Sequence, residues 1–168
     1  MRSVKEARRQ MLMNVKAVLN IPGTEVPVDC AVSPERLETV TQIHGYRFVS
    51  PLTLKGVIRN RAGVATVQAQ VACTLELTCD RCLKPFTRDF CYEGSHVIVR
   101  NLDNADEDDA DMDDYVIARA ESIDTDEIAV SDLVLELPSK MLCREDCKGL
   151  CPVCGADRNE VDCGHMSE

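Results

Sequence analysis

The chain has 168 residues, of which 45% are apolar by type, and a formal net charge of −10. It contains no stretch near the ~18 apolar residues that a membrane span needs, so we expect a soluble protein of one domain or two small ones and exclude membrane enzymes. Residues 1–100 hold 14 Lys and Arg against 9 Asp and Glu, whereas residues 101–168 hold 5 against 20. The basic part can therefore meet phosphate while the acidic part faces water or a basic partner.

The first elements along the chain are predicted to be short helices. Ser3 and Glu6 fit a capping box, and apolar residues recur at helical spacing from Met11 to Leu19, although alternate residues from Met13 to Leu19 also suit a strand. Pro22-Gly23 ends this tract. Ser33-Pro34 predicts the start of a second short helix, with the serine as cap and the proline at the first helical position.

The centre of the chain has the alternation of β-strands. Odd positions from Ala65 to Leu77 are apolar and the even ones mostly polar, which predicts a long half-buried strand. A similar run at 52–58 precedes it across a hairpin turn at 60–63, and a third run follows at 86–99, bent or bulged near Gly94. We expect three antiparallel strands and a fourth around residues 28–32.

The C-terminal third combines an acidic loop, a helix and a tail. Residues 102–115 carry eight carboxylates, and Asp124 with Glu127 then caps a helix that ends at Pro138. Its predicted buried stripe is Val130, Leu133, Val134 and Leu137. The sequence thus predicts a basic segment at 1–20, an α+β domain at 21–140 with the acidic loop 102–115, and a Cys-rich tail at 141–168. We expect a curved antiparallel sheet, one packed helix, and a zinc-binding tail docked on the hairpin tip.

Ten cysteines in a chain of this size require an explanation, and the cellular compartment decides which one applies. The basic N-terminus lacks the unbroken apolar stretch and the cleavage site of a signal peptide, so we expect a cytoplasmic protein with reduced thiols. Cys79 and Cys82 form a Cys-x-x-Cys turn between two strands, which favours a zinc knuckle over a redox dithiol or ordinary thiols. The tail adds further candidate ligands at short spacing: Cys143, Cys147, Cys151, Cys154, Cys163 and His165.

These eight candidate ligands are enough for two tetrahedral sites. The preferred division joins Cys79 and Cys82 to Cys143 and Cys147, and leaves Cys151, Cys154, Cys163 and His165 as a second site. The alternative is one zinc ribbon made of Cys79, Cys82, Cys151 and Cys154, with the other thiols free. Either arrangement implies one or two structural zinc ions, because a catalytic zinc keeps one position open for water or substrate.

The remaining cysteines and histidines are predicted to be structural. Cys73 lies on the inward side of the long strand, and we expect Cys30 and Cys91 to be core residues as well. His44 and His96 lack partner spacing and are assigned to structure or surface. Because the sequence has no hydrolase triad, zinc-protease motif or phosphate loop, we expect no enzymatic activity and no small-molecule substrate.

Basic residues near the turns are the candidates for nucleic-acid contact. Rigid turns that present Arg and Lys can reach phosphates or base edges, although a solvated strand surface is the simpler interpretation of each residue. The candidates are Arg59, Arg61, Arg81, Lys84 and Arg88.

The two cysteine segments together resemble those of a bacterial family. Cys79-Asp-Arg-Cys82-Leu83 with Pro85-Phe86, and the tail segment from Cys147 to Gly155 with Asn159, are similar to the YceD family of large ribosomal RNA subunit accumulation proteins. The resemblance spans roughly residues 15–165. Relatives with such a tail commonly end in Cys-x-Cys where this chain has Cys163-Gly-His165, and relatives of the enterobacterial type lack the tail.

The resemblance implies a cytoplasmic, non-enzymatic ribosome-biogenesis factor that supports the accumulation, processing or stability of large-subunit ribosomal RNA. We expect it to bind that RNA or a pre-ribosomal particle. One alternative is an acidic adaptor that shields a basic ribosomal protein through the acidic loop. A second alternative is a redox switch in which oxidation of the thiols ejects zinc.

Overall fold

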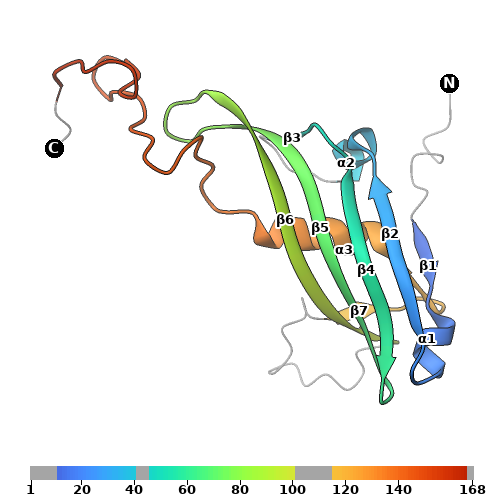
Figure 1. The fold of residues 1–168 in the computed structure, drawn as a ribbon. Helices are drawn as coiled ribbons and strands as arrows, with labels where there is room; N and C mark the ends of the chain where they lie inside the picture. The colour runs from blue at the N-terminus through green and yellow to red at the C-terminus, as the bar shows by residue number, and fades with distance from the viewer. Residues whose placement is uncertain (1–10, 41–45, 101–114, 166–168) are drawn as a thin grey trace, which may run out of the picture.

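A computed structural model describes residues 11–40, 46–100 and 115–165, and its architecture is α+β. The main sheet contains β2 (Glu25–Val32), β4 (Leu52–Arg61), β5 (Val64–Thr78), β6 (Pro85–Val99) and β7 (Tyr115–Ile117) in that order. The short strand β3 (Tyr46–Phe48) pairs with β5 at Leu75–Leu77, just beyond the N-terminal end of β4. The helix α3 (Thr125–Glu136) crosses one face of this sheet (Figure 1).

The predicted strands are confirmed, including the fourth one, which is β2. β2, β4, β5 and β6 pair in antiparallel order, whereas β7 joins β6 in parallel. The predicted bulge near Gly94 is wrong, because the β5–β6 register is continuous and Gly94 lies opposite Ala69. Glycine is present there for another reason: a Cβ at residue 94 would lie 2.6 Å from Asp132 Oδ2 of α3. The predicted curvature of the sheet stays a prediction.

The N-terminal part differs from the predicted helix. Residues Leu12–Asn14 form the strand β1, and only Lys16–Asn20 form a helix, α1. β1 pairs with β8 (Ser122–Asp124), which lies directly before α3. The capping pair Ser3 and Glu6 lies outside the described residues. The second short helix is confirmed as α2 (Pro34–Val40).

The core lies between the sheet and α3. The odd residues of β5 from Ala65 to Leu77 are buried as predicted, Cys73 among them, and Cys30 of β2 is buried as well. The prediction for Cys91 is wrong, because this residue is exposed. Cys91 lies opposite Ala72, one of the even β5 residues that point away from α3.

The buried face of α3 is rotated from the predicted stripe. Asp124 caps the helix as predicted, since its side chain accepts hydrogen bonds from the backbone N–H groups of Asp126 and Glu127. However, Val134 is 45% exposed, and the buried face consists of Thr125, Asp126, Ile128, Ala129, Asp132 and Leu133. Its polar members have partners: Thr125 Oγ1 donates to Met11 O at 2.9 Å, Asp126 pairs with Arg36, and Asp132 pairs with His96. Leu133 is buried as predicted, and Val130 and Leu137 pack half-buried against the core. The predicted stripe is therefore wrong at Val134 and lacks the buried polar residues.

Candidate metal centres

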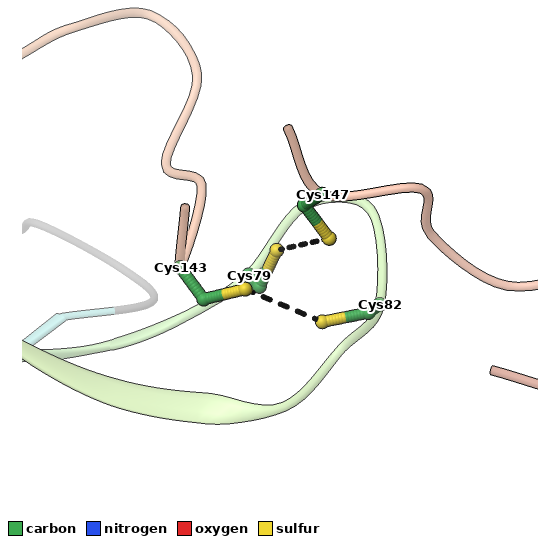
Figure 2. A group of neighbouring side chains, drawn as sticks. All are labelled: Cys79, Cys82, Cys143 and Cys147. Carbon is green, nitrogen blue, oxygen red and sulfur yellow. Dashed lines mark hydrogen bonds between the residues drawn. The ribbon is translucent and has the colours of Figure 1, made fainter. Parts of the chain in front are cut away.

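The first candidate metal centre joins the β5–β6 turn to the tail. Cys79 and Cys82 belong to this turn, Cys143 and Cys147 belong to the tail, and the four sulfur atoms lie within 4.8 Å of one another (Figure 2). Cys79, Cys82 and Cys147 are buried. Cys79 Sγ lies 3.8 Å from Cys147 Sγ, and Cys82 Sγ lies 3.7 Å from Cys143 Sγ. The structure thus brings together residues more than sixty positions apart.

These sulfur separations match the edges of a coordination tetrahedron. Four thiolates at about 2.3 Å from a central ion lie about 3.8 Å from one another, whereas a disulfide needs about 2.05 Å. All ten cysteines are free thiols. The donor set therefore fits a tetrahedral divalent ion coordinated only by protein.

The backbone around Cys79 favours a thiolate. Burial, the largest influence, raises the pKa of Cys79, but the backbone N–H groups of Cys143, Cys82 and Arg81 donate to its sulfur and together lower this pKa to about 6. Burial and the neighbouring sulfur atoms raise the pKa of Cys143 to about 12. Without a cation, the low pKa of Cys79 and the high pKa of Cys143 favour one thiolate beside a neutral thiol. A bound cation would stabilise both sulfur atoms as thiolates, because each ligand binds in that form.

Hydrogen bonds from the turn hold the tail beside this centre. Asp80 N donates to Met141 O at 2.8 Å, and Met141 N donates to Asp80 Oδ2 at 2.6 Å. Arg81 Nη1 donates to Cys147 O at 2.8 Å, and Leu150 N donates to Arg81 O at 3.0 Å. Arg88 Nη2 donates to Leu142 O at 2.6 Å. The turn therefore binds the tail on both sides of Cys143 and Cys147.

Asn159 is a supporting residue that sequence reasoning missed as part of the metal site. Its Nδ2 lies 3.5 Å from Cys147 Sγ, and its Oδ1 accepts hydrogen bonds from Lys148 N at 2.8 Å and Arg144 Nη2 at 2.7 Å. The only sequence signal was its presence in the family-like tail segment. A hydrogen bond to a ligand sulfur orients that ligand.

The second candidate centre is local to the tail. Cys151, Cys154, Cys163 and His165 offer ligand atoms within 4.8 Å of one another. Cys151 is buried, whereas Cys154 and His165 are exposed. Donation from the backbone N–H groups of Cys154 and Val153 lowers the pKa of Cys151 to about 6. This donor set also fits a tetrahedral ion, with histidine supplying the nitrogen.

The grouping of the eight residues follows the preferred division. Cys151 and Cys154 lie in a different group from Cys79 and Cys82, so the single ribbon made of both Cys-x-x-Cys pairs is not the arrangement found. His165 completes the second group as its one nitrogen ligand.

The five basic candidates lie at opposite ends of the sheet. Arg59 and Arg61 lie at the β4–β5 hairpin, where Arg59 is 3.8 Å from Glu25 and Arg61 is exposed. Arg81, Lys84 and Arg88 lie at the metal end. There Arg81 and Arg88 bind tail carbonyls, and Lys84 pairs with Asp157 at 2.8 Å and with Glu160.

The two histidines that were assigned to structure or surface are His44 and His96. His96 Nε2 of β6 lies 2.8 Å from Asp132 Oδ1 of α3, and both side chains are largely buried. His44 and most of the acidic segment 102–115 lie outside the described residues.

In the described part of the chain, no helix is long and apolar enough to cross a membrane.

Comparison with known proteins places the tail, α3 and the C-terminal strands of the sheet in one family. Residues 67–168 match the family model described as large ribosomal RNA subunit accumulation protein YceD. Uncharacterized proteins of Mycobacterium tuberculosis and Mycobacterium bovis are 34% identical over 77 residues, which are 46% of this chain and 37% of each relative. The chain thus spans little more than a third of the curated relatives it matches. No solved structure matches it. Because the matched segment covers more than half of the chain and includes all eight candidate ligands, the protein belongs to the YceD family of large ribosomal RNA subunit accumulation proteins.

Proposed function

We propose that this protein is a cytoplasmic, non-enzymatic factor in the assembly of the large ribosomal subunit. It would support the accumulation of large-subunit ribosomal RNA by binding that RNA or a precursor particle. The observation that carries the proposal is the family match over residues 67–168, which ties most of β5, β6, β7, α3 and the tail to a family described by that RNA. The charge division between the two parts of the chain supports a role for its basic half.

The metal chemistry is proposed to be structural, and zinc is the proposed ion. Cys79, Cys82, Cys143 and Cys147 would hold one ion, and the group that ends in His165 would hold a second. Zinc is the common partner of four-cysteine and three-cysteine, one-histidine sets. Four protein ligands leave no position for water or substrate, so each ion would act as a crosslink.

The proposed RNA contact is the β4–β5 hairpin end of the sheet. Arg59 and Arg61 are joined there by two further cations, Arg100 and Lys16. Arg100 Nη2 donates to Asn20 Oδ1 at 2.6 Å, and Asn60 Nδ2 donates to Val18 O at 2.6 Å, so α1 connects Arg100 to the hairpin. Lys16 is paired with Glu121 at 3.2 Å, and Arg59 with Glu25 at 3.8 Å. The exposed Arg61 and Arg100 are therefore the positive charges that this end offers to phosphate. Arg81, Lys84 and Arg88 support RNA binding less well, because their side chains already bind the tail.

Charge reversal at each end of the sheet tests this proposal. Arg61→Glu is compared with Lys140→Glu, an equal charge change at an exposed residue of the metal end. Binding of the metal-loaded protein to large-subunit ribosomal RNA is measured at several salt concentrations, together with sedimentation on precursor particles. We expect Arg61→Glu to weaken binding and to reduce the salt slope by about 1, and Lys140→Glu to leave both unchanged.

The contrary outcomes separate the proposed functions. If the wild type neither binds this RNA in a salt-sensitive way nor sediments with precursor particles, the proposal is wrong. If deletion of residues 103–114 abolishes capture of a basic ribosomal protein while RNA binding persists, the adaptor function is favoured instead. Loss of zinc under mild oxidant would favour the redox switch.

A further inference from the structure

The two Cys-x-x-Cys turns have the same backbone geometry. Leu83 N donates to Cys79 O at 2.9 Å, and Gly155 N donates to Cys151 O at 2.9 Å. In the reverse direction, Cys79 N donates to Lys84 O at 3.0 Å, and Cys151 N donates to Ala156 O at 2.8 Å. Leu83 and Gly155 therefore hold equivalent positions, each directly after the second cysteine of its turn.

This position requires a left-handed backbone. The φ angle is 59° at Leu83 and 73° at Gly155. Glycine adopts this conformation without strain, whereas the Cβ of any other L-residue approaches the following carbonyl oxygen. Leu83 thus destabilises a turn that glycine at the same position would form without strain.

Burial within the chain compensates little for this strain. The Leu83 side chain is 62% exposed, so most of its apolar surface remains in water. Two other exposed aliphatic residues lie in the tail, Val153 at 69% and Val161 at 56%. Lys84, next to Leu83 in the sequence, pairs with Glu160, next to Val161, so one ion pair joins these two chain segments. Strained backbone of this kind occurs at ligand and partner contacts, and among the described non-glycine residues with positive φ, Leu83 is the one with a large apolar side chain.

The charge of the surroundings favours a protein partner over RNA. We define the metal lobe as residues 79–84 and 140–165, which hold six Lys and Arg and six Asp and Glu and contain no aromatic residue. Seven thiolates and two divalent ions would add a net charge of about −3. Such a surface does not attract phosphate and offers no ring for base stacking. Its exposed large apolar residues, Leu83, Val153 and Val161, are all aliphatic, and these suit an apolar pocket.

We propose that the Leu83 side chain inserts into an apolar pocket of a protein component of the large-subunit precursor particle. This proposal rests on the proposed function. Leu83 is exposed and directly follows Cys82, one of the four candidate ligands, so a bound ion would hold its backbone in place. The partner would bind this end of the molecule while RNA contacts the opposite end.

Three variants of the metal-loaded full chain test the proposal on purified precursor particles. Leu83→Gly removes both the strain and the side chain, Leu83→Met retains an apolar side chain, and Leu135→Gln removes an exposed leucine of α3 as the control. We expect Leu83→Gly to bind particles at least about tenfold more weakly, while its melting temperature rises by about 2–4 °C. Leu83→Met and Leu135→Gln should bind within about threefold of the wild type, and all variants should keep their metal.

A crosslink identifies the class of partner. Leu83→p-benzoylphenylalanine, irradiated on the purified particles, should join a ribosomal protein identified by mass spectrometry. A crosslink to ribosomal RNA would overturn the proposal, as would wild-type binding by Leu83→Gly or a lower melting temperature of that variant. If the wild type binds no particle, the proposed function fails and this inference fails with it. If only the Leu83 variants behave contrary to expectation, the proposed function stands.

Discussion

Removal of the metal should release the tail and leave the sheet folded. The first metal centre joins the tail to the β5–β6 turn, whereas the main core, which includes Leu52, Ile58 and Val71, contains none of its four ligands. Treatment with a strong chelator is therefore expected to remove order locally. The affected segment is Met141 to Cys151.

The hydrogen bonds and apolar contacts of this segment are too few to order it alone. Fixing the eleven residues from Met141 to Cys151 costs about 11–22 kcal/mol of conformational entropy. Five hydrogen bonds to the turn and to Arg88 of β6 contribute about 5 kcal/mol, and burial of Met141 adds about 2 kcal/mol. The shortfall of roughly 4–15 kcal/mol is similar to the ~10–16 kcal/mol that a structural zinc site supplies.

Hydrogen exchange read by mass spectrometry measures this effect. After chelation, we expect the amide of Leu150, which donates to Arg81 O, to exchange at the rate of an unfolded peptide, while the amides of β5 keep their protection. Re-addition of zinc should restore the protection of Leu150. If Leu150 stays protected once elemental analysis shows that the metal is gone, the ion does not order the tail. If β5 loses protection together with the tail, the effect of the ion is not local.

Three substitutions test individual parts of the structure. Asn159→Ala removes the hydrogen bond to Cys147 Sγ and should weaken metal retention about tenfold or more, measured as release to a coloured chelator. Gly56→Ala places a Cβ 2.0 Å from Gln68 O, and urea unfolding should show a loss of about 3 kcal/mol or more. Asp124→Ala removes the cap of α3 and should cost about 1 kcal/mol in the same assay.

Each substitution has a matched control. Lys148→Ala keeps the backbone N–H group that donates a hydrogen bond to Asn159 Oδ1, so metal release from this variant should equal that from the wild type. Gly63→Ala meets no atom within 4 Å and should cost only the ~1 kcal/mol of its left-handed φ. Glu136→Ala, at the opposite end of α3, should change stability by less than about 0.5 kcal/mol. A loss at Gly63 equal to that at Gly56 would contradict the packing argument.

Local patterns predicted the long elements of the fold well. Alternation from Ala65 to Leu77 identified β5, and Asp124 identified the start of α3. The three-residue strands β1, β3, β7 and β8 could not be found in this way, because their pairing depends on residues distant in the chain, such as Leu12 with Asp124. The predicted buried face of α3 was right at Leu133 but omitted Asp126 and Asp132, which are buried through their partners Arg36 and His96.

The candidate site, like the fold, could be predicted only in part from the sequence. Spacing and ligand type predicted that Cys79 and Cys82 meet Cys143 and Cys147, and the structure brings these residues together. Spacing does not show that Arg81, Lys84 and Arg88 bind the tail, because their partners are backbone carbonyls and carboxylates fixed only by tertiary structure. The strain at Leu83 was equally invisible, since it becomes apparent only when φ is compared with that of Gly155.

Two groups of four ligands are proposed to hold structural metal ions. Elemental analysis of native purified protein measures this metal content, with Cys79→Ser and Cys151→Ser analysed beside the wild type. We expect about two zinc ions per chain in the wild type and about one in each variant. If the wild type carries no stoichiometric metal, or if the variants retain the full wild-type content, these residues do not hold the ions.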